Sequence, residues 1–145
     1  MPQEPTRPRS LAGYLDALSR AVFEGGISWK VVEAKWGDIR EAFHGFDPHW
    51  VAALTPKQID RLAHDPKVIR NRPKIEGTAE NARTLLDLDG VHHGFRRYLR
   101  SFADFDSIAT DLRKRFRFIG PSGAYHFLWQ VGEPVPDYQD WRAAR

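Results

Sequence analysis

Residues 24–29, Glu-Gly-Gly-Ile-Ser-Trp, bring a carboxylate, a glycine pair and a large aromatic ring into one short stretch. The glycines end one amphipathic segment and carry no Cβ, so the backbone here can approach another surface closely. Trp29 then presents a flat indole, Glu24 can face the same space, and Gly26 and Ile27 form a wedge between them. This combination suits a pocket that binds a planar base. The alternative is a corner between two helices with Ile27 and Trp29 in the core.

A second candidate lies mid-chain, where four basic residues fall close together: Lys67, Arg70, Arg72 and Lys74. Pro73 cannot lie deep inside a helix, so we expect a turn between two helices with Asn71 or Arg72 near the cap of the second. Backbone amides and cations at such a turn suit a phosphate group, although a solvated helix end would look the same. We interpret the other basic cluster, residues 113–117, as a solvated helix face.

Metal and cofactor chemistry find no support in the residue patterns. The histidines show neither the HExxH spacing nor a paired carboxylate spacing that marks zinc sites: His44, His49, His64, His92, His93 and His126. No glycine-rich dinucleotide motif, P-loop or serine-hydrolase motif occurs. We therefore expect neither a metal nor a cofactor.

Composition narrows the class of protein. The chain has 145 residues, 41% hydrophobic and 28% charged, which is typical of one soluble globular domain. No apolar run approaches the ~20 residues that cross a bilayer, and the start of the chain lacks a secretory pattern, so we expect no membrane association. The absence of cysteine fits a reducing compartment, and we expect a cytoplasmic protein. The formal net charge of +3 permits a polyanionic partner.

Apolar residues recur at spacings of three and four along most of the chain, which predicts an all-α fold of about seven or eight short helices. The expected helices cover roughly residues 11–24, 29–43, 49–54, 56–64, 73–88, 92–102, 108–115 and 121–131. Their expected caps include Ser10, Ser28, Thr55 with Gln58, and Asp106 or Ser107. We interpret residues 1–9 as a flexible basic arm, 10–132 as a single compact domain and 133–145 as an irregular tail.

Four motifs occur in order along residues 11–132. They are Glu-Gly-Gly-Ile-Ser-Trp at 24–29, Phe-His-Gly-Phe-Asp-Pro at 43–48, Ile-Arg-Asn-Arg-Pro-Lys-Ile at 69–75 with Asn81-Ala82-Arg83, and Phe-Arg-Phe-Ile-Gly-Pro at 116–121 with Tyr125 and Phe127. Together they resemble the DNA-3-methyladenine glycosylase I family, a branch of the helix–hairpin–helix DNA glycosylases. The resemblance implies a helical fold that binds double-stranded DNA containing a damaged base and flips that base out.

The resemblance also implies roles for residues of this chain. Trp29 matches the ring that stacks on the methylated adenine, and Gly26 and Ile27 match the positions that fill the gap left in the duplex. The hairpin that holds the phosphate backbone matches Lys67, Arg70, Asn71, Arg72 and Lys74.

The matching base pocket departs from the family pattern. Ser122 and Tyr125 match its wall, but the family's pocket glutamate, which reads the adenine edge, aligns with Ala21. Glu24 lies one helical turn further on, on nearly the same face, and we take it as the catalytic candidate. The family's amino-terminal wall and its zinc clasp of two Cys and two His have no counterparts here, so we predict no zinc and an altered lesion specificity.

Three functions follow from this resemblance. The first is a DNA-repair glycosylase that hydrolyses the N-glycosidic bond of an alkylated purine, whose positive charge already weakens that bond, so that a fitted pocket and a water suffice. The second is a binding module of the same fold that recognises lesions or distorted DNA without cleavage. The third is a domain whose missing pocket wall comes from another chain, as in a homo-oligomer.

Overall fold

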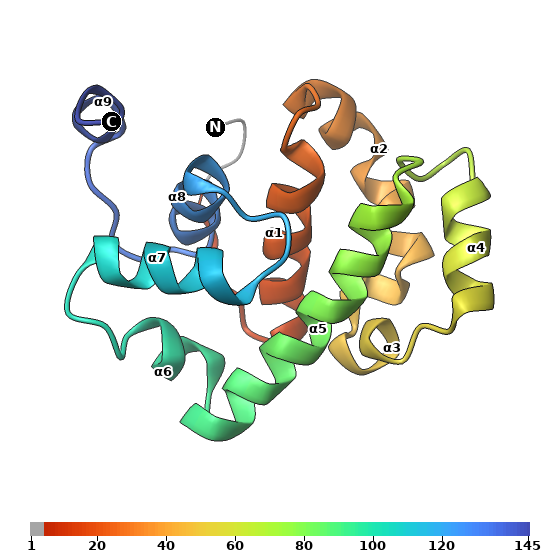
Figure 1. Cartoon of the computed structure of the whole chain (residues 1–145), viewed down its shortest axis with the longest axis horizontal. Coiled ribbons are helices and arrows are strands. Elements are labelled where there is room, and N and C mark those ends of the chain that lie inside the picture. Colours follow the sequence, from red (N-terminus) through yellow and green to blue (C-terminus); the bar gives the residue numbers. More distant parts are fainter. Residues whose placement is uncertain (1–4) are drawn as a thin grey trace.

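Helices alone make up the regular structure of the computed structural model, which describes residues 5–145 (Figure 1). A short 3-10 helix, η1 (His44–Phe46), joins α2 to α3. The α-helices are α1 (Leu11–Glu24), α2 (Trp29–Ala42), α3 (Pro48–Ala52), α4 (Pro56–His64), α5 (Arg72–His92), α6 (Phe95–Leu99), α7 (Phe105–Arg115), α8 (Pro121–Gln130) and α9 (Tyr138–Ala143). Within residues 5–145 no strand occurs, and the all-α prediction is confirmed.

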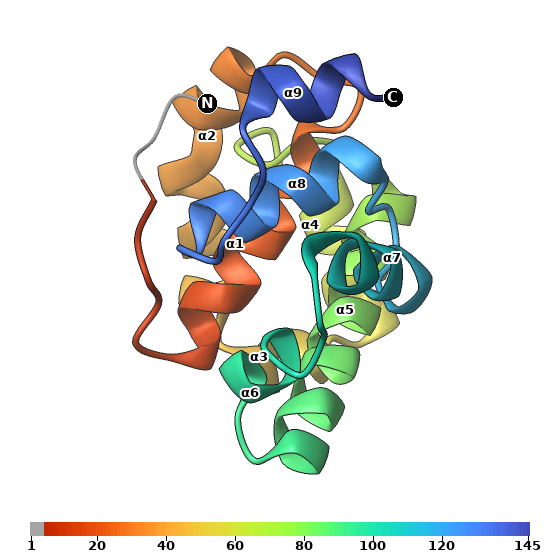
Figure 2. The same cartoon turned by 90° about the vertical axis from the view of Figure 1, so that its left-hand side faces the viewer.

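The long helix α5 crosses the molecule diagonally, with α1, α3, α4 and α6 packed against it (Figure 1). α1 packs against both α5 and α8, because its apolar residues form a broad buried stripe that includes Leu15, Leu18 and Val22. In Figure 2, α8 lies across α1 and α9 lies beyond α8. The core therefore gathers around α1 and α5.

The packing of α2 on α1 is fixed by the carboxylate of Asp16. Its Oδ1 accepts a hydrogen bond from Trp36 Nε1 at 3.0 Å, and its Oδ2 pairs with Arg40 Nε at 2.6 Å. Trp36 is buried, so this bond satisfies an indole N–H that would otherwise lose its water partner. This contact, together with the buried Val32 and Ile39, holds α2 against the rest of the molecule.

Capping residues begin several helices where the sequence predicted. Thr55 and Gln58 form the expected capping box of α4, and Ser28 Oγ accepts the N–H of Lys30 at 3.3 Å. Asn71 Oδ1 accepts the N–H of Lys74 at 3.1 Å, which places the start of α5.

Two boundaries differ from the prediction around Gly90. α5 continues past it to His92 and ends where His93 takes a left-handed conformation with φ 57°. A glycine inside a helix costs only about 1 kcal/mol, which the packing of α5 on α6 outweighs. α6 is correspondingly shorter than the predicted helix over 92–102.

α7 also starts earlier than predicted, because Asp104 rather than Asp106 or Ser107 is its N-cap. The carboxylate of Asp104 accepts the N–H of Ser107 at 2.9 Å. Both candidates therefore lie inside the first turn.

The two predicted terminal segments contain defined contacts. Residues 1–4 of the predicted arm lie outside the described residues, and in its remainder the N–H of Thr6 donates to the carbonyl of Gln130 at 2.8 Å. The tail expected to be irregular contains α9 over residues 138–143. Asp137 begins this helix, because its carboxylate accepts the N–H groups of Gln139 and Asp140.

The loop between α7 and α8 is anchored to α5 by Asn81, which is 1% exposed. Asn81 Nδ2 donates to the carbonyl of Arg117 at 3.1 Å, and its Oδ1 accepts the N–H of Arg117 at 2.7 Å. Nearby, the exposed side chains of Arg117 and Glu80 form an ion pair at 2.7 Å. A buried amide and a surface ion pair thus join the same loop to the same helix.

We expect Asn81→Ala to lower the free energy of unfolding by about 2 kcal/mol, because it leaves two backbone groups without partners. The matched control Glu80→Ala removes only an exposed ion pair and should cost under about 1 kcal/mol. Urea denaturation followed by circular dichroism measures both. Equal losses for the two variants would contradict the assignment of Asn81 as the anchor.

Candidate functional site

The glycine pair forms a tight corner between α1 and α2. Gly25 follows the last turn of α1, with its N–H donating to the carbonyl of Val22, and Gly26 has a φ of 81° that favours glycine. The N–H of Ile27 then donates to the carbonyl of Glu24 at 3.2 Å, which turns the chain back toward α2. The corner is exposed at both glycines, so its backbone is accessible to a large partner.

Trp29, the first residue of α2, lies at the surface with 43% of its area exposed. The ammonium of Lys30 lies 5.9 Å from the centre of its ring. Ile27 is half-buried and packs against the core. The alternative that places both residues in the core is therefore wrong for Trp29 and holds only in part for Ile27. An exposed indole beside a cation is a surface on which a planar base can stack.

A small cavity lies between α1 and α8. Its lining residues are Ala17, Arg20, Ala21, Glu24, His126, Phe127 and Gln130. The α1 members recur at three- and four-residue spacing, so they share one face of that helix. The cavity volume is about 10 Å³, which is about the room that one water needs. Ala21 and Glu24 thus lie together as predicted, while Trp29 lines none of this cavity.

Burial shifts the pKa values of two groups that line this cavity. It raises the pKa of the Glu24 carboxyl, with Glu33 raising it further and Arg20 opposing the shift. It lowers the pKa of the His126 imidazole, which favours the neutral ring. A neutral imidazole carries one donor and one acceptor, which matches the hydrogen-bonding edge of a purine.

His126 is a residue that the sequence reasoning missed. The sequence feature that could have indicated it is a titratable side chain inside the otherwise apolar segment 124–129. Only the packing of α8 on α1 shows that this side chain faces Ala21.

The predicted hairpin exists as the turn between α4 and α5. Lys67 and Arg70 are exposed, and within residues 5–145 neither side chain forms an ion pair. In the same part of the chain no group accepts the N–H of Ile69 or of Arg70. Two exposed cations and two amides without a partner in the described residues therefore lie at one turn, which suits a phosphate.

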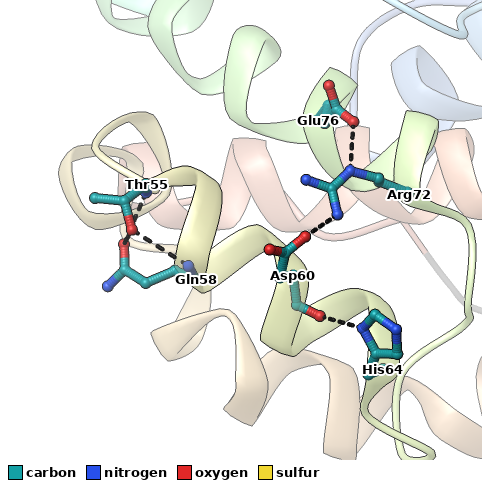
Figure 3. Close-up of polar contacts among 6 residues, drawn as sticks. All are labelled: Thr55, Gln58, Asp60, His64, Arg72 and Glu76. Carbon is teal, nitrogen blue, oxygen red and sulfur yellow. Dashed lines mark hydrogen bonds and ion pairs between the residues drawn. The ribbon is translucent and has the colours of Figure 1, made fainter.

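Three other residues predicted for this hairpin have partners inside the protein. Arg72 pairs with Asp60 of α4 and with Glu76 one turn along α5, and the hydrogen bond to Asp60 raises its pKa (Figure 3). Asn71 caps α5. Lys74 donates from Nζ to the carbonyl of Gly25, and burial lowers the pKa of its ammonium. These residues brace the hairpin, and Lys74 joins it to the glycine corner.

The two residues predicted to form the pocket wall, Ser122 and Tyr125, differ in their exposure. Ser122 is exposed in the first turn of α8. Tyr125 is 3% exposed, its hydroxyl donates to the carbonyl of Pro136 at 2.7 Å, and the ring of Trp141 stacks on it at 4.5 Å. Residues of the tail and of α9 therefore cover Tyr125, because the segment predicted to be irregular folds over α8.

Within residues 5–145, no three His, Cys, Asp or Glu side chains are grouped so that they could hold a metal ion. The same part of the chain contains no helix that is both long and apolar enough to span a membrane. The predicted absence of zinc stays a prediction.

Known proteins that are similar in sequence to this chain belong to one family. The sequence model of the methyladenine glycosylase family matches residues 12–111. The chain is 31% identical over 130 residues to DNA-3-methyladenine glycosylase of Haemophilus influenzae, and 30% identical over 130 residues to DNA-3-methyladenine glycosylase 1 of Escherichia coli K12. Each match covers 75% of this chain and 70% of the relative.

Solved structures agree in fold. A crystal structure of a variant of 3-methyladenine DNA glycosylase I in complex with 3-methyladenine superposes with a TM-score of 0.77 at 25% identity, covering 89% of this chain and 80% of that one. A solution structure of 3-methyladenine DNA glycosylase I gives a TM-score of 0.75 at 26% identity, covering 89% and 81%.

We expect His126→Gln to change how stability depends on pH. In the wild type the folded state favours the neutral ring, so the unfolded chain binds more protons and stability falls as pH drops below about 6.5. The variant lacks this loss. The free energy of unfolding of the wild type should therefore fall relative to that of the variant as pH drops from about 7 to 5. A constant difference across this range would show that the ring titrates alike in both states.

Proposed function

This chain belongs to the methyladenine glycosylase family, and we propose that it is a base-excision repair enzyme that hydrolyses the N-glycosidic bond of an alkylated purine in double-stranded DNA. The observation that carries the proposal is the exposed Trp29 beside the glycine corner, tied through Lys74 to the hairpin. One face thus offers a stacking ring, a close-approach backbone and a phosphate site.

The target bond lies inside the base stack, so the damaged base must first leave it at a cost of a few kcal/mol. Stacking on Trp29 returns about 1–3 kcal/mol. Gly26 and Ile27 would enter the gap, because the bare backbone allows close approach while Ile27 supplies an apolar surface. The hairpin at Lys67 and Arg70 would hold the phosphate backbone while the base moves.

Bond cleavage requires little from the protein, because N3-alkylation makes the purine a better leaving group. We propose that Glu24 positions the attacking water and stabilises the positive charge that develops on the sugar. His126 would bind the edge of the base in the space that the Ala21 side chain leaves. We propose a 3-methyladenine-like lesion with a specificity that this histidine alters.

The second candidate function is recognition of a lesion or distorted duplex without cleavage. It is favoured by the size of the cavity beside Ala21, which holds about one water and must open to admit a purine. In a third candidate function, a second copy of the chain supplies the wall that the pocket beside Ala21 lacks. The cytoplasmic location expected from the sequence stays a prediction.

The test is base release from methylated duplex DNA, detected by chromatography, with a family member of known activity run in parallel. Release of an alkylated purine supports the enzyme. Tight binding to an abasic-site duplex with no base released supports the binding module. Light scattering at the assay concentration shows whether one copy or two carry the activity.

Trp29→Ala should remove the preference for damaged DNA and leave binding to undamaged duplex unchanged. The indole contacts only the flipped base, so a loss of about tenfold or more in damaged-over-undamaged affinity is expected. Trp29→Phe, which keeps an aromatic face, should retain most of the preference. Fluorescence anisotropy with matched duplexes measures both, and an unchanged preference in Trp29→Ala would refute the stacking role.

Lys67→Ala combined with Arg70→Ala should weaken binding to all duplexes alike. Each cation that meets a phosphate contributes about one unit to the slope of log affinity against log salt, so the slope should fall by about two. Arg72→Ala is the matched control, because its guanidinium already pairs with Asp60 and Glu76. A larger change in slope for this control than for the double variant would reverse the assignment.

A further inference from the structure

A pocket with a volume of about 450 Å³ lies between α6, α7, α8 and the segment that follows α8. Its size falls within the range of about 300–1,000 Å³ that is typical of small-molecule sites. Most of its wall is apolar and comes from Leu99, Phe102, Phe105, Ile108, Leu128 and Pro134. In Figure 1, α6 and α7 lie toward the left and the α4–α5 hairpin lies at the right. The pocket shares no lining residue with the small cavity between α1 and α8, so it is separate from the site assigned to the damaged base.

The end of α8 places Glu133 in this pocket through a Schellman motif. The N–H of Gly132 donates to the carbonyl of Trp129 at 3.1 Å, and the N–H of Glu133 donates to the carbonyl of Leu128 at 3.0 Å. Gly132 has the positive φ, 80°, that this motif requires. In such motifs an apolar residue commonly follows the glycine and packs on the last turn of the helix. Here a carboxylate stands in that position, and its backbone is held by the helix end.

The carboxylate of Glu133 is only partly satisfied by its surroundings. Its side chain is 5% exposed, and Oε1 pairs with Arg100 Nε at 3.2 Å. The other oxygen, Oε2, is buried and has no hydrogen-bond partner within residues 5–145. A buried acceptor of this kind costs free energy, and native proteins contain few of them. The terminal torsion of a glutamate turns readily, so the carboxylate can accept from Arg100 and also from a donor that enters the pocket.

The charges around the pocket favour a cation. Two carboxylates, Glu133 and Asp104, and one guanidinium, Arg100, line it, so its lining carries a net negative charge. Hydrogen bonds from Ser107 lower the pKa of the Asp104 carboxyl, which keeps it ionised at neutral pH. A neighbouring cavity of about 360 Å³ shares Asp104 and adds two further carboxylates and one ammonium, from Asp106, Asp111 and Lys114. This acidic region stands out in a chain whose formal net charge is +3.

We propose that this pocket binds a small organic cation, in which a protonated amine is attached to an apolar body. The amine donates to the carboxylate of Glu133, and the apolar body packs against Phe102, Phe105 and Ile108. A neutral ligand would leave the negative charge of the lining uncompensated, and an anion would be repelled by it. This inference does not depend on the proposed function, because no residue of the pocket takes part in binding the damaged base or the duplex.

The experiment titrates the protein at neutral pH with benzylammonium, benzyl alcohol and benzoate, which share a ring and differ in charge. Two-dimensional amide NMR spectra of isotope-labelled protein report binding. Benzylammonium should shift the signals of residues 99–108 and 133 until they saturate. It should bind about tenfold more tightly than benzyl alcohol, because a charge-assisted hydrogen bond is stronger than a neutral one. Benzoate should bind most weakly of the three.

Glu133→Gln should weaken benzylammonium about tenfold and leave benzyl alcohol unchanged, because it removes the charge and keeps the shape of the side chain. Glu80→Gln is the matched control, because it removes an exposed carboxylate that pairs with Arg117 and does not line the pocket. The same spectra show whether each variant is folded. If Glu133→Gln does not fold, Ala103→Trp takes its place. Ala103 is an exposed residue of the pocket wall, and a tryptophan there should fill the pocket and abolish binding.

Benzoate or benzyl alcohol binding as tightly as benzylammonium overturns the proposal. So does a folded Glu133→Gln or Ala103→Trp variant that binds benzylammonium as the wild type does. Signal shifts that do not saturate, or that fall outside the pocket, also count against it. The base-release assay reports separately on the proposed function, so an inactive protein that binds benzylammonium through Glu133 refutes the enzyme and leaves the cation site standing.

Discussion

The hydrogen bond from the Lys74 ammonium to the Gly25 carbonyl joins the hairpin between α4 and α5 to the glycine corner between α1 and α2. The proposed DNA-binding face depends on this bond. The end of a helix leaves carbonyl groups without intrahelical partners, and a cation there satisfies one and complements the helix dipole. Because Lys74 belongs to the first turn of α5, the same bond holds the glycine corner against the hairpin. Burial lowers the pKa of this ammonium, as expected for a cation drawn from solvent into a structural contact.

Further contacts that position neighbouring segments are spaced along α5. The hairpin precedes its first turn, Lys74 holds the corner, Gly77 supports the Phe118 ring, and Asn81 fixes the loop before α8. Segments far apart in the chain thus meet on one face of a single rigid helix (Figure 1).

In the pocket beside α1, different side chains stand where the family pattern has a glutamate. Where a glutamate would offer a fixed charge, Ala21 leaves space, and the half-buried His126 and Glu24 border it. Burial raises the pKa of the Glu24 carboxyl, which Arg20 opposes, and lowers the pKa of the His126 imidazole. An alkylated purine carries its own positive charge, which is why we assign catalysis to positioning more than to a strong base.

Local features were the ones that sequence analysis predicted well. The capping box at Thr55, the cap at Asn71 and the ending of α1 at Gly25 each depend on a few adjacent residues, and each is where the pattern placed it. The predicted start of α7 was less accurate, because Asp104, Asp106 and Ser107 compete for one cap. The tail was predicted to be irregular from its prolines, although Asp137 caps α9 there. Which cap forms depends on the packing of the helix that follows.

The amino-acid sequence by itself determined the helical class, the glycine corner and the presence of a cationic turn, because these follow from spacing and from single-residue preferences. Tertiary structure decided which of those residues face outward. Trp29 and Phe118 are exposed while Tyr125 is covered, although all three are aromatic residues in matching motifs. Arg70 faces solvent while Arg72 is paired, although the two are separated by one residue. Exposure and pairing depend on neighbours from distant segments, and only the folded chain brings those neighbours together.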